Sequence, residues 1–402
     1  MLGSARYTPP AAPTANSTRT RAFLRTFVVD SLLLKLCSRC NINCTYCYWF
    51  RDGSAYSMSK LLTRDAEKLL LRRLEQHIIR YQLKHFAICF HGGEPLLFGK
   101  RRFGTLCSSL RRLQESLACS IDLTIQTNGI LIDEEWCSLF RYFRVSPSLS
   151  LDGPGELHDH NRIDHVGRGT YSQVVTALHL LQSEGFTPGV LAVCNPGSSA
   201  ADLCNHFVKD LNVRWFDVLF PDVTHHDIVR PVASYFKDLF DRWYDDLRYQ
   251  GITIRVAENL LLGVLGRRST SESLGLGPLT TFAITPDGSF ELCDVFHSVG
   301  LNAACAGLNL ASNNLQEIVT SPRWVEVLNA SLDLAGVCKR CRFYSACGGG
   351  YVPNRWSNEM RYDNPSAYCS DLQDIFRHVS NRVLSSGLPQ VTVPPQLEQA
   401  TL

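Results

Sequence analysis

The stretch Cys40-Asn41-Ile42-Asn43-Cys44-Thr45-Tyr46-Cys47 carries three thiols, separated by three and by two residues. The apolar run 32–36 precedes it and predicts a buried strand that leads into a cysteine loop. A cubane iron–sulfur cluster takes about four thiolates from its protein, so three would leave one iron open to a small ligand. The alternative is a structural zinc loop with a fourth ligand from elsewhere, such as Cys37.

The composition is that of a globular protein, with 45% hydrophobic and 19% charged residues in a chain of 402. This length predicts one large domain and a smaller one. The net charge of +2 gives no electrostatic reason to expect nucleic acid or an anionic membrane as a partner. No apolar run approaches the roughly 20 residues that span a bilayer. Residues 1–25 lack the apolar core of a secretory signal, so we expect a cytoplasmic protein with a disordered N-terminal tail.

Seven of the sixteen cysteines fall into two groups, at 40–47 and 338–369, and the others are scattered. A secreted disulfide framework would be expected in a smaller chain with more evenly placed cysteines. Grouped cysteines in a chain of this size indicate metal ligation in a reducing compartment. The members of the second group are Cys338, Cys341, Cys347 and Cys369.

From residue 30 onward, predicted strands and helices alternate six times. The strands are expected at 32–36, 85–90, 121–127, 145–151, 188–194 and 214–220. Helices such as 63–83 have apolar residues at helical spacing, and Thr63 and Asp133 are placed to cap two of them. Successive β/α units imply a parallel sheet with right-handed crossovers. Because six units are too few for a closed eight-stranded barrel, the expected α/β fold is a partial (β/α)6 barrel.

Short polar motifs follow three of these strands, at the sheet edge where parallel sheets bind ligands. They are Gly92-Gly93-Glu94-Pro95, Gln126-Thr127-Asn128-Gly129, and Ser150-Leu151-Asp152-Gly153-Pro154 with His158, Asp159 and Arg162 beyond it. Together with the cysteine loop, and in this order, the motifs closely resemble radical S-adenosylmethionine (SAM) enzymes that carry a SPASM-type C-terminal extension. The resemblance covers about residues 30–375.

The resemblance implies that Cys40, Cys44 and Cys47 hold a [4Fe-4S] cluster whose open iron binds SAM. It further implies a set of SAM contacts from Tyr46, Gly92, Gly93, Glu94, Asn128, Ser150, Asp152 and Arg162. The glycines and Glu94 would lie beside the SAM ammonium, and Arg162 would pair with its carboxylate. Asn128, Ser150 and Asp152 would bond ribose hydroxyls, and Tyr46 would lie along the adenine. The alternatives are a surface ion pair between Asp152 and Arg162, and plain packing of Tyr46.

In SPASM enzymes, the cysteine pattern of the second group holds one auxiliary [4Fe-4S] cluster, and the alternative is a structural zinc site. Relatives with two auxiliary clusters have further cysteines that this chain lacks, one in the window 271–278 and one at the position of Tyr351. Cys293 keeps one ligand of that further site, and adding Cys305 would not restore four. We therefore expect a single auxiliary cluster.

The expected organisation has five parts. A hairpin near 281–292 opens the C-terminal region, and a last helix is expected at 372–384. The parts are a disordered tail at 1–27, the radical SAM partial barrel at 28–228, a helical linker at 229–280, a SPASM-like domain at 281–385, and a Pro-rich tail at 386–402.

Segments in the second half narrow the resemblance, among them 216–221 and 363–369. They are similar to maturases of ribosomally made peptides, above all those that join an aromatic side chain to a nearby β-carbon and form a cyclophane. The implied reaction is removal of a β-hydrogen by a 5′-deoxyadenosyl radical, followed by attack of that carbon on the ring. Asp294 matches a residue proposed as the catalytic base in sulfatase-maturating relatives, and the alternative is a carboxylate that faces water.

The implied partners are a precursor peptide and an electron donor such as flavodoxin or ferredoxin. The rival functions are ether crosslinking, epimerisation of a peptide, formylglycine formation in sulfatases, and, in another class, a non-catalytic iron–sulfur electron carrier. Formylglycine formation is disfavoured because those relatives keep both auxiliary sites. The complete set of SAM motifs argues against a carrier, which has no use for them.

Overall fold

One ten-stranded sheet runs through the molecule. The computed structural model describes residues 18–300 and 302–385, and in them the strand order is β10-β9-β8-β1-β2-β3-β4-β5-β6-β7. The strands from β1 to β7 pair in parallel. They are β1 (Ser31–Cys37), β2 (His85–Gly92), β3 (Ser120–Thr127), β4 (Val145–Ser150), β5 (Gly189–Val193), β6 (Trp215–Leu219) and β7 (Thr253–Ile254). The α/β partial barrel is confirmed, and β7 extends it into the segment that was expected to be a purely helical linker.

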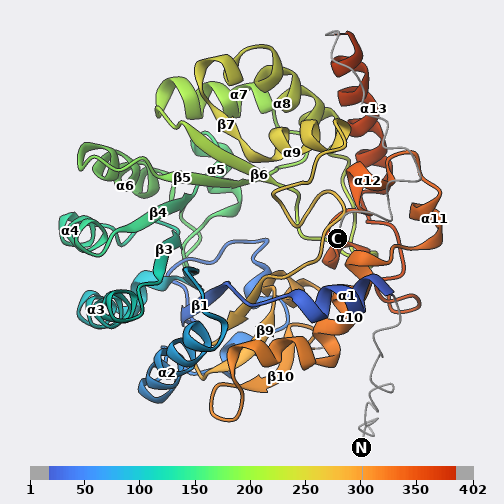
Figure 1. Cartoon of the computed structure of the whole chain (residues 1–402). Helices are drawn as coiled ribbons and strands as arrows, with labels where there is room; N and C mark the ends of the chain where they lie inside the picture. Colours follow the sequence, from blue (N-terminus) through green and yellow to red (C-terminus); the bar gives the residue numbers. More distant parts are fainter. Residues whose placement is uncertain (1–17, 301, 386–402) are drawn as a thin grey trace, which may run out of the picture.

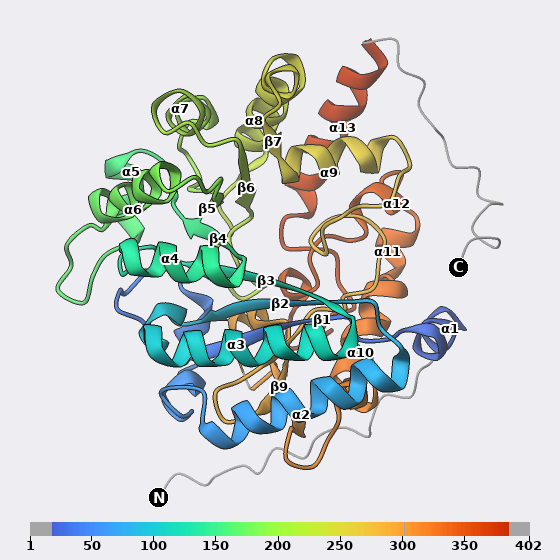
Figure 2. The same cartoon turned by 60° about the vertical axis from the view of Figure 1, so that its left-hand side comes forward.

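Helices cover the outer face of the curved sheet, and Figure 2 shows α2, α3 and α4 lying side by side along it (Figures 1 and 2). The Thr63 hydroxyl accepts a bond from the Ala66 N–H at 3.1 Å, and Asp133 accepts one from the Trp136 N–H at 3.0 Å, so both predicted caps form. The helices of this half are α2 (Arg64–Tyr81), α3 (Lys100–Leu117), α4 (Glu134–Phe143), α5 (Gly155–Asn161), α6 (Tyr171–Ser183), α7 (Ala200–Asn205), α8 (Ala233–Asp245) and α9 (Arg255–Val264).

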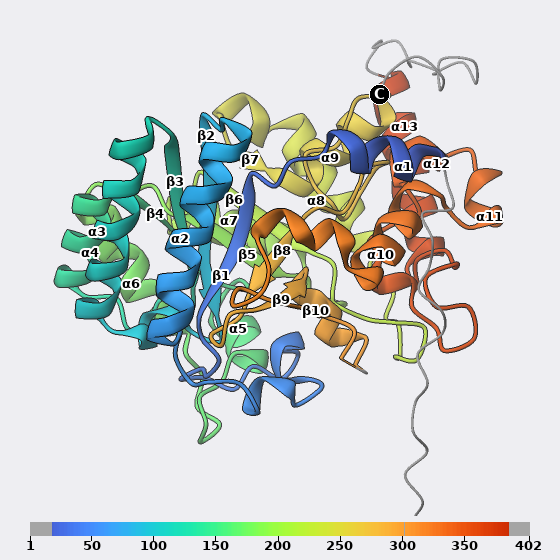
Figure 3. The same ribbon diagram turned by 60° about the horizontal axis from the view of Figure 1, so that its bottom comes forward.

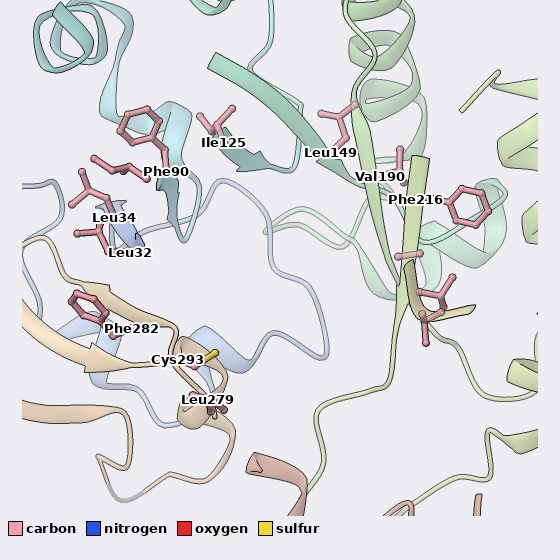
Figure 4. Packing of buried hydrophobic residues seen from close by; sticks show 14 of the residues in the cluster. Leu32, Leu34, Phe90, Ile125, Leu149, Val190, Phe216, Leu279, Phe282 and Cys293 are labelled. Carbon is pink, nitrogen blue, oxygen red and sulfur yellow. The ribbon is translucent and has the colours of Figure 1, made fainter. Parts of the chain in front are cut away.

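Strands β2 to β5 each bury one face against the helices and leave the other more accessible. In β2 the burial alternates residue by residue, as expected when successive side chains point to opposite faces. Figure 4 shows part of the apolar layer that results, from Leu32, Leu34, Phe90, Ile125, Leu149, Val190 and Phe216. The opposite face of the sheet is therefore left to line the interior of the barrel.

The C-terminal region continues the same sheet. The predicted hairpin forms from β8 (Phe282–Ile284) and β9 (Ser289–Leu292), and β10 (Cys305–Asn309) pairs with β9. β8 lies parallel to β1, with Leu33 opposite Ala283, so the sheet crosses the domain boundary expected at residue 281 (Figure 3). The helices of this region are α10 (Pro322–Leu332), α11 (Gly336–Lys339), α12 (Tyr344–Cys347) and α13 (Cys369–Ser385).

The expectation of a disordered tail at 1–27 is wrong from residue 18 onward. Residues Thr18–Thr26 form α1, and the Phe27 ring stacks on Trp324 of α10 with centroids 5.5 Å apart. The Gln316 side chain donates to the Phe27 carbonyl at 2.7 Å. Apolar side chains among the arginines give this short helix a face to bury, which composition alone did not reveal. The rest of that tail, 1–17, and the Pro-rich tail, 386–402, lie outside the described residues.

Candidate active site

The cysteine loop leaves the carboxyl end of β1 and is fixed to the last residue of α5 and to the segment after it. The Asn43 N–H donates to the Ile163 carbonyl at 2.7 Å, and the Thr45 N–H donates to the Asn161 carbonyl at 3.0 Å. The thiols of the loop, at Cys40, Cys44 and Cys47, are all partly accessible. Cys37 is buried on the strand itself, so the structure gives it a packing role.

Gly92 and Gly93 are needed because the cysteine loop passes directly over them. A Cβ on Gly92 would fall on the Cys37 carbonyl oxygen, and one on Gly93 would fall on the Arg39 carbonyl oxygen. The close approach lets the Gly93 N–H donate to the Cys37 carbonyl and the Glu94 N–H donate to the Arg39 carbonyl, both at 2.8 Å. The glycines thus hold the cysteine loop against the end of β2.

Glu94 does not face an open site, contrary to the expectation of a charge beside the SAM ammonium. Its buried carboxylate accepts bonds from the Leu96 N–H at 2.9 Å, the Thr127 hydroxyl at 2.7 Å and the Asn128 N–H at 2.9 Å. Burial raises the pKa of Glu94 to about 7, against the opposing effect of these bonds. Glu94 therefore ties the end of β2 to the end of β3.

Asn128 reaches back to the cysteine loop. Its side-chain nitrogen donates to the Asn41 side chain at 2.8 Å and lies 3.7 Å from the Cys40 sulfur. Ser150, at the end of β4, accepts a bond from the Gln126 amide at 2.9 Å. Asn128 is thus placed on the cysteine loop, whereas Ser150 remains partly accessible at the sheet edge.

Asp152 and Arg162 form a buried ion pair, so the alternative of a surface ion pair is wrong. The Arg162 Nε lies 2.9 Å from Asp152 Oδ2, and the guanidinium lies 5.5 Å from the Tyr46 ring centroid. Asp152 also accepts bonds from the Tyr46 hydroxyl and from the Val193 N–H, which hold its carboxylate in place at the end of β4.

Arg162 connects this pair to the cysteine loop. Its Nη1 lies 4.0 Å from the Cys44 sulfur. Burial raises the pKa of the Cys44 thiol to about 11, and the Arg162 charge opposes that rise. Donors aimed at cysteine sulfurs are the surroundings that an anionic iron–sulfur cluster requires, so the loop fits the group that the sequence predicts.

The second cysteine group closes around a small cavity. Helices α11, α12 and α13, with the turn between α11 and α12, bring its four members to the lining of one cavity of about 40 Å³; these are Cys338, Cys341, Cys347 and Cys369. Arg355 lies behind them, buried, and donates to the carbonyls of Gly348 and Gly350. Four thiols around one cavity fit a closed auxiliary cluster.

Within residues 18–300 and 302–385, no three His, Cys, Asp or Glu side chains converge closely enough to hold a single metal ion. A zinc site draws about four ligands to within roughly 2.3 Å of one atom. A cubane instead binds each thiolate to a different iron, which spreads the sulfurs around the cluster. The preference for clusters over zinc therefore rests on the cysteine pattern and on the donors beside the loop sulfurs.

Cys293 is buried and its sulfur lies 3.0 Å from the Tyr351 hydroxyl. Tyr351 stands where a further ligand would be expected in relatives with two auxiliary clusters. Cys305 is exposed on β10 and does not line the cavity that Cys293 lines. Cys293 therefore has a phenol as its neighbour.

A cavity of about 460 Å³ lies between the interior of the barrel and the C-terminal region. Asp294 lines it but does not face bulk water as the alternative required, because it is buried and forms an ion pair with Lys35. The Tyr48 hydroxyl donates to Asp294 at 2.8 Å, and His91 lies 3.7 Å away. Burial alone would raise the pKa of Asp294, but the neighbouring Lys35 holds it below its usual range.

Lys35, Tyr48 and His91 were not singled out from the sequence. Lys35 offered a signal, because it interrupts the apolar run of β1 and is fully buried there. A buried lysine requires a charged partner, which predicts an acid on a facing element. The sequence offers no comparable signal for His91 or Tyr48. Each lies next to a motif that was interpreted from its other residues.

Comparisons with known proteins agree with this geometry. The Radical SAM superfamily model matches residues 34–207. A cysteine-type anaerobic sulfatase-maturating enzyme of Clostridium perfringens is 28% identical over 372 residues, covering 88% of this chain and 97% of the relative. A serine-type enzyme of Bacteroides thetaiotaomicron is 25% identical over 85% of this chain and 87% of its own.

Solved structures give the same picture. One described as native anSMEcpe with bound AdoMet superposes with a TM-score of 0.75 at 25% identity, over 89% of this chain and 98% of the other. Streptococcus suis SuiB, in a structure bound to precursor peptide SuiA, superposes with a TM-score of 0.59 at 16% identity, over 87% of this chain and 79% of the other. The second likeness concerns the fold alone.

Proposed function

The chain is a radical SAM enzyme that uses a [4Fe-4S] cluster and SAM, and from this premise we propose which residues hold them. Cys40, Cys44 and Cys47 hold the cluster that binds SAM. The second group holds one auxiliary [4Fe-4S] cluster, through Cys338, Cys341, Cys347 and Cys369. The four-thiol cavity and the donors aimed at the loop sulfurs support this assignment.

The residues around SAM divide into contacts and supports. Arg162 pairs with the SAM carboxylate, since its guanidinium lies beside the Cys44 sulfur, and Ser150 bonds a ribose hydroxyl, since it remains partly accessible at the sheet edge. Tyr46 lies along the adenine and is held by its bond to Asp152. Gly92, Gly93, Glu94 and Asn128 act through the backbone and the cysteine loop, because their polar groups are used there.

The enzyme acts on a peptide. The observation that carries this proposal is the 460 Å³ cavity between barrel and C-terminal region, which is lined by Asp294 and by Tyr48, whose phenol donates to Asp294. The relatives point the same way, since anSMEcpe has been solved with a bound Kp18Cys peptide and SuiB with its precursor peptide. When bound, the cluster and SAM supply a 5′-deoxyadenosyl radical that removes a hydrogen atom from a substrate β-carbon.

The finer proposal is a crosslink between an aromatic side chain and a nearby β-carbon of a ribosomally made precursor, which gives a cyclophane. It rests on the resemblance of the segments 216–221 and 363–369 to cyclophane-forming maturases. The Cys293–Tyr351 contact, in place of a complete further ligand set, also supports a departure from enzymes with two auxiliary clusters. Electrons would come from a donor such as flavodoxin or ferredoxin.

Formylglycine formation is the second candidate. It is favoured by the 28% identity to the cysteine-type sulfatase-maturating enzyme over 88% of this chain. Both reactions begin with loss of a β-hydrogen, so the same cavity and clusters serve either one. The choice between them depends on what reacts with the β-carbon radical.

The test has two stages. The protein is first reconstituted anaerobically with iron and sulfide and then given SAM and dithionite. We expect 5′-deoxyadenosine to form, and its absence would refute the assignment of the chain as a radical SAM enzyme. The enzyme is then co-expressed with small peptides encoded beside its gene and with a sulfatase fragment, and the products are examined by mass spectrometry. Loss of two hydrogens without an aldehyde that reacts with hydrazides supports the crosslink. An aldehyde supports formylglycine, and an unchanged mass with an inverted residue supports epimerisation.

A further inference from the structure

Four carboxylates line the large cavity, and three of them already have partners. Asp217 lies 2.6 Å from the Arg255 guanidinium, and Asp294 pairs with Lys35. Glu272 accepts the N–H groups of residues 280 and 281 at 2.6 and 3.0 Å. The fourth, Asp222, makes no hydrogen bond or ion pair through its carboxylate with any residue of 18–300 or 302–385, and it is accessible from the cavity.

Asp222 is held in place by its backbone. It lies just past the carboxyl end of β6, and its carbonyl accepts a bond from Arg51 at 3.1 Å. The carbonyl of the next residue, Val223, accepts one from the Asn354 side chain at 2.7 Å. Arg51 also pairs with Asp227. The loop is therefore fastened to the cysteine-loop side and to the C-terminal region, which fixes where the free carboxylate points.

The two unequal carboxylates of the cavity, Asp222 and Asp294, have opposite electrostatics. Burial and the nearby charge of Asp294 raise the pKa of Asp222 to about 7, and Arg51 opposes the rise. The other titratable groups that face Asp222 are the phenols of Tyr48, Tyr351 and Tyr368, which carry no charge near neutral pH. Asp294, by contrast, is kept ionised by Lys35 and is a weak base.

We propose that Asp222, rather than Asp294, is the catalytic proton acceptor of the reaction in this cavity. This inference rests on the proposed function. In a crosslink, the substrate gives one hydrogen atom to the 5′-deoxyadenosyl radical, and the β-carbon forms a bond to the ring. The ring radical then gives one electron to an iron–sulfur acceptor and its ring proton to the Asp222 carboxylate, which restores aromaticity. In formylglycine formation from serine, the proton given to Asp222 is the hydroxyl proton instead.

Asp294 then has a positioning role. Its pair with Lys35 fixes a negative charge beside Asp222, which favours the protonated form that Asp222 reaches at the end of the reaction. A base that titrates near the working pH is the effective kind, and general-base catalysis contributes about 10²–10⁴-fold to rates. Asp222 has no charged partner and can take up the proton, whereas Asp294 is held by Lys35 and stays ionised. The different surroundings of the two carboxylates therefore give them different roles.

The test measures product formation against pH with the peptide that mass spectrometry shows to be modified. In the wild type, the rate should rise as the pH passes through about 7, because the ionised form of Asp222 is the base. Asp222→Asn should lower product formation about 100-fold and abolish the pH dependence, with a much smaller effect on 5′-deoxyadenosine formation. Asp222→Glu should restore part of the rate together with the pH dependence.

Two further variants control the result. Glu75→Gln alters an exposed acid on α2 and should leave rate and pH profile unchanged. Asp294→Asn should shift the pH profile to lower pH, because it removes the charge that raises the pKa of Asp222. The proposal is overturned if Asp222→Asn keeps the wild-type rate and profile, or if Asp294→Asn abolishes the pH dependence while Asp222→Asn retains it.

Infrared difference spectroscopy tests the titration of Asp222 without a substrate. Because the pKa of Glu94 is also raised to about 7, the measurement compares the wild type with Asp222→Asn. The protonated-carboxyl band that appears as the pH falls through about 7 should be weaker in Asp222→Asn than in the wild type and in Glu75→Gln. Equal bands in the wild type and Asp222→Asn would overturn the inference. An enzyme that shows the Asp222 contribution but modifies no peptide would contradict the proposed function, whereas the titration of Asp222 would stand.

Discussion

The cysteine loop at 40–47 and the C-terminal cysteine group both consist of thiols, but they differ in the number of thiols and in how far these are enclosed. The loop presents three thiols at the end of a strand, all partly accessible, with Arg162 and Asn128 directed at its sulfurs. The C-terminal group surrounds a cavity of about 40 Å³ with four thiols, three of them from helices and one from the turn between α11 and α12. In the proposed assignment, this difference separates a cluster with one iron open to SAM from a closed cluster that carries electrons.

The largest effect is expected from removing one thiol of the cysteine loop. Cys44→Ala should abolish 5′-deoxyadenosine formation and lower the iron content of the reconstituted protein from about eight atoms to about four. Iron and sulfide analysis with a SAM-cleavage assay measures both quantities. Retained SAM cleavage in this variant would contradict the assignment of the loop.

Removing one thiol of the C-terminal cysteine group should stop product formation but not SAM cleavage. Cys347→Ala is expected to lose about four irons as well, yet to keep 5′-deoxyadenosine formation while the peptide product disappears. The reason is that SAM binds at the other cluster, whereas completion of the product requires an electron acceptor. Equal loss of both activities would show that the two groups are not functionally separate.

The contribution of the Asp152–Arg162 ion pair, which lies beside the cysteine loop, can be measured by unfolding the protein. Asp152→Asn leaves the Arg162 charge buried without its partner, and breaking a buried pair costs about 3–5 kcal/mol of unfolding free energy. Urea denaturation of the cluster-free protein measures it. The matched control is Asp374→Asn, which breaks the exposed pair with Arg377 and should have little effect. Equal stabilities for the two variants would argue against a buried pair.

A smaller and pH-dependent effect is expected where the cysteine-loop side meets the hairpin. His297 lies 3.1 Å from Asp52 and 3.3 Å from Glu291. Burial would lower its pKa, but the bonds to Glu291 and Asp52 raise it above the ordinary value. The stabilisation is therefore complete below a pH of about 6.5, the unfolded pKa, and is lost as the pH rises through the folded pKa.

The corresponding change is His297→Ala, which should cost about 2 kcal/mol at low pH and progressively less at higher pH. Denaturation midpoints across the pH range measure the difference. A deficit that grows with pH would reverse the sign of the linkage and contradict this account.

The smallest effect is expected at the position that separates this chain from relatives with a further cluster. Tyr351→Cys would place a thiol beside Cys293, at the position of the phenol 3.0 Å away. The window 271–278 still lacks a cysteine, so the iron content should stay at about eight atoms. A rise to about twelve would show that the further site needs fewer thiols than we assume.

The strands and their functional ends were predictable because both depend on neighbouring residues. Apolar runs marked the parallel strands, and Thr63 and Asp133 marked helix starts that the structure confirms. The four thiols of the second group were predictable as a set from their pattern. Only the fold brings Cys369 beside Cys338, Cys341 and Cys347.

What the sequence did not reveal depends on distant partners. Lys35 and Asp294 are 259 positions apart, so their ion pair could not be predicted from the neighbours of either residue. Glu94 matched its motif, yet its carboxylate, at the end of β2, accepts bonds from Thr127 and Asn128 at the end of β3. α1 was missed because the face that it buries, around Trp324, lies about 300 residues further along the chain.

The most direct test of the contrast between the two cysteine groups is electron paramagnetic resonance of the reduced, reconstituted enzyme with and without SAM. We expect two [4Fe-4S] signals, of which SAM alters one and leaves the other unchanged, and we expect the altered one to persist in Cys347→Ala. A protein in which SAM alters both signals or neither, or in which Cys347→Ala removes the SAM-sensitive signal, would contradict the central claim.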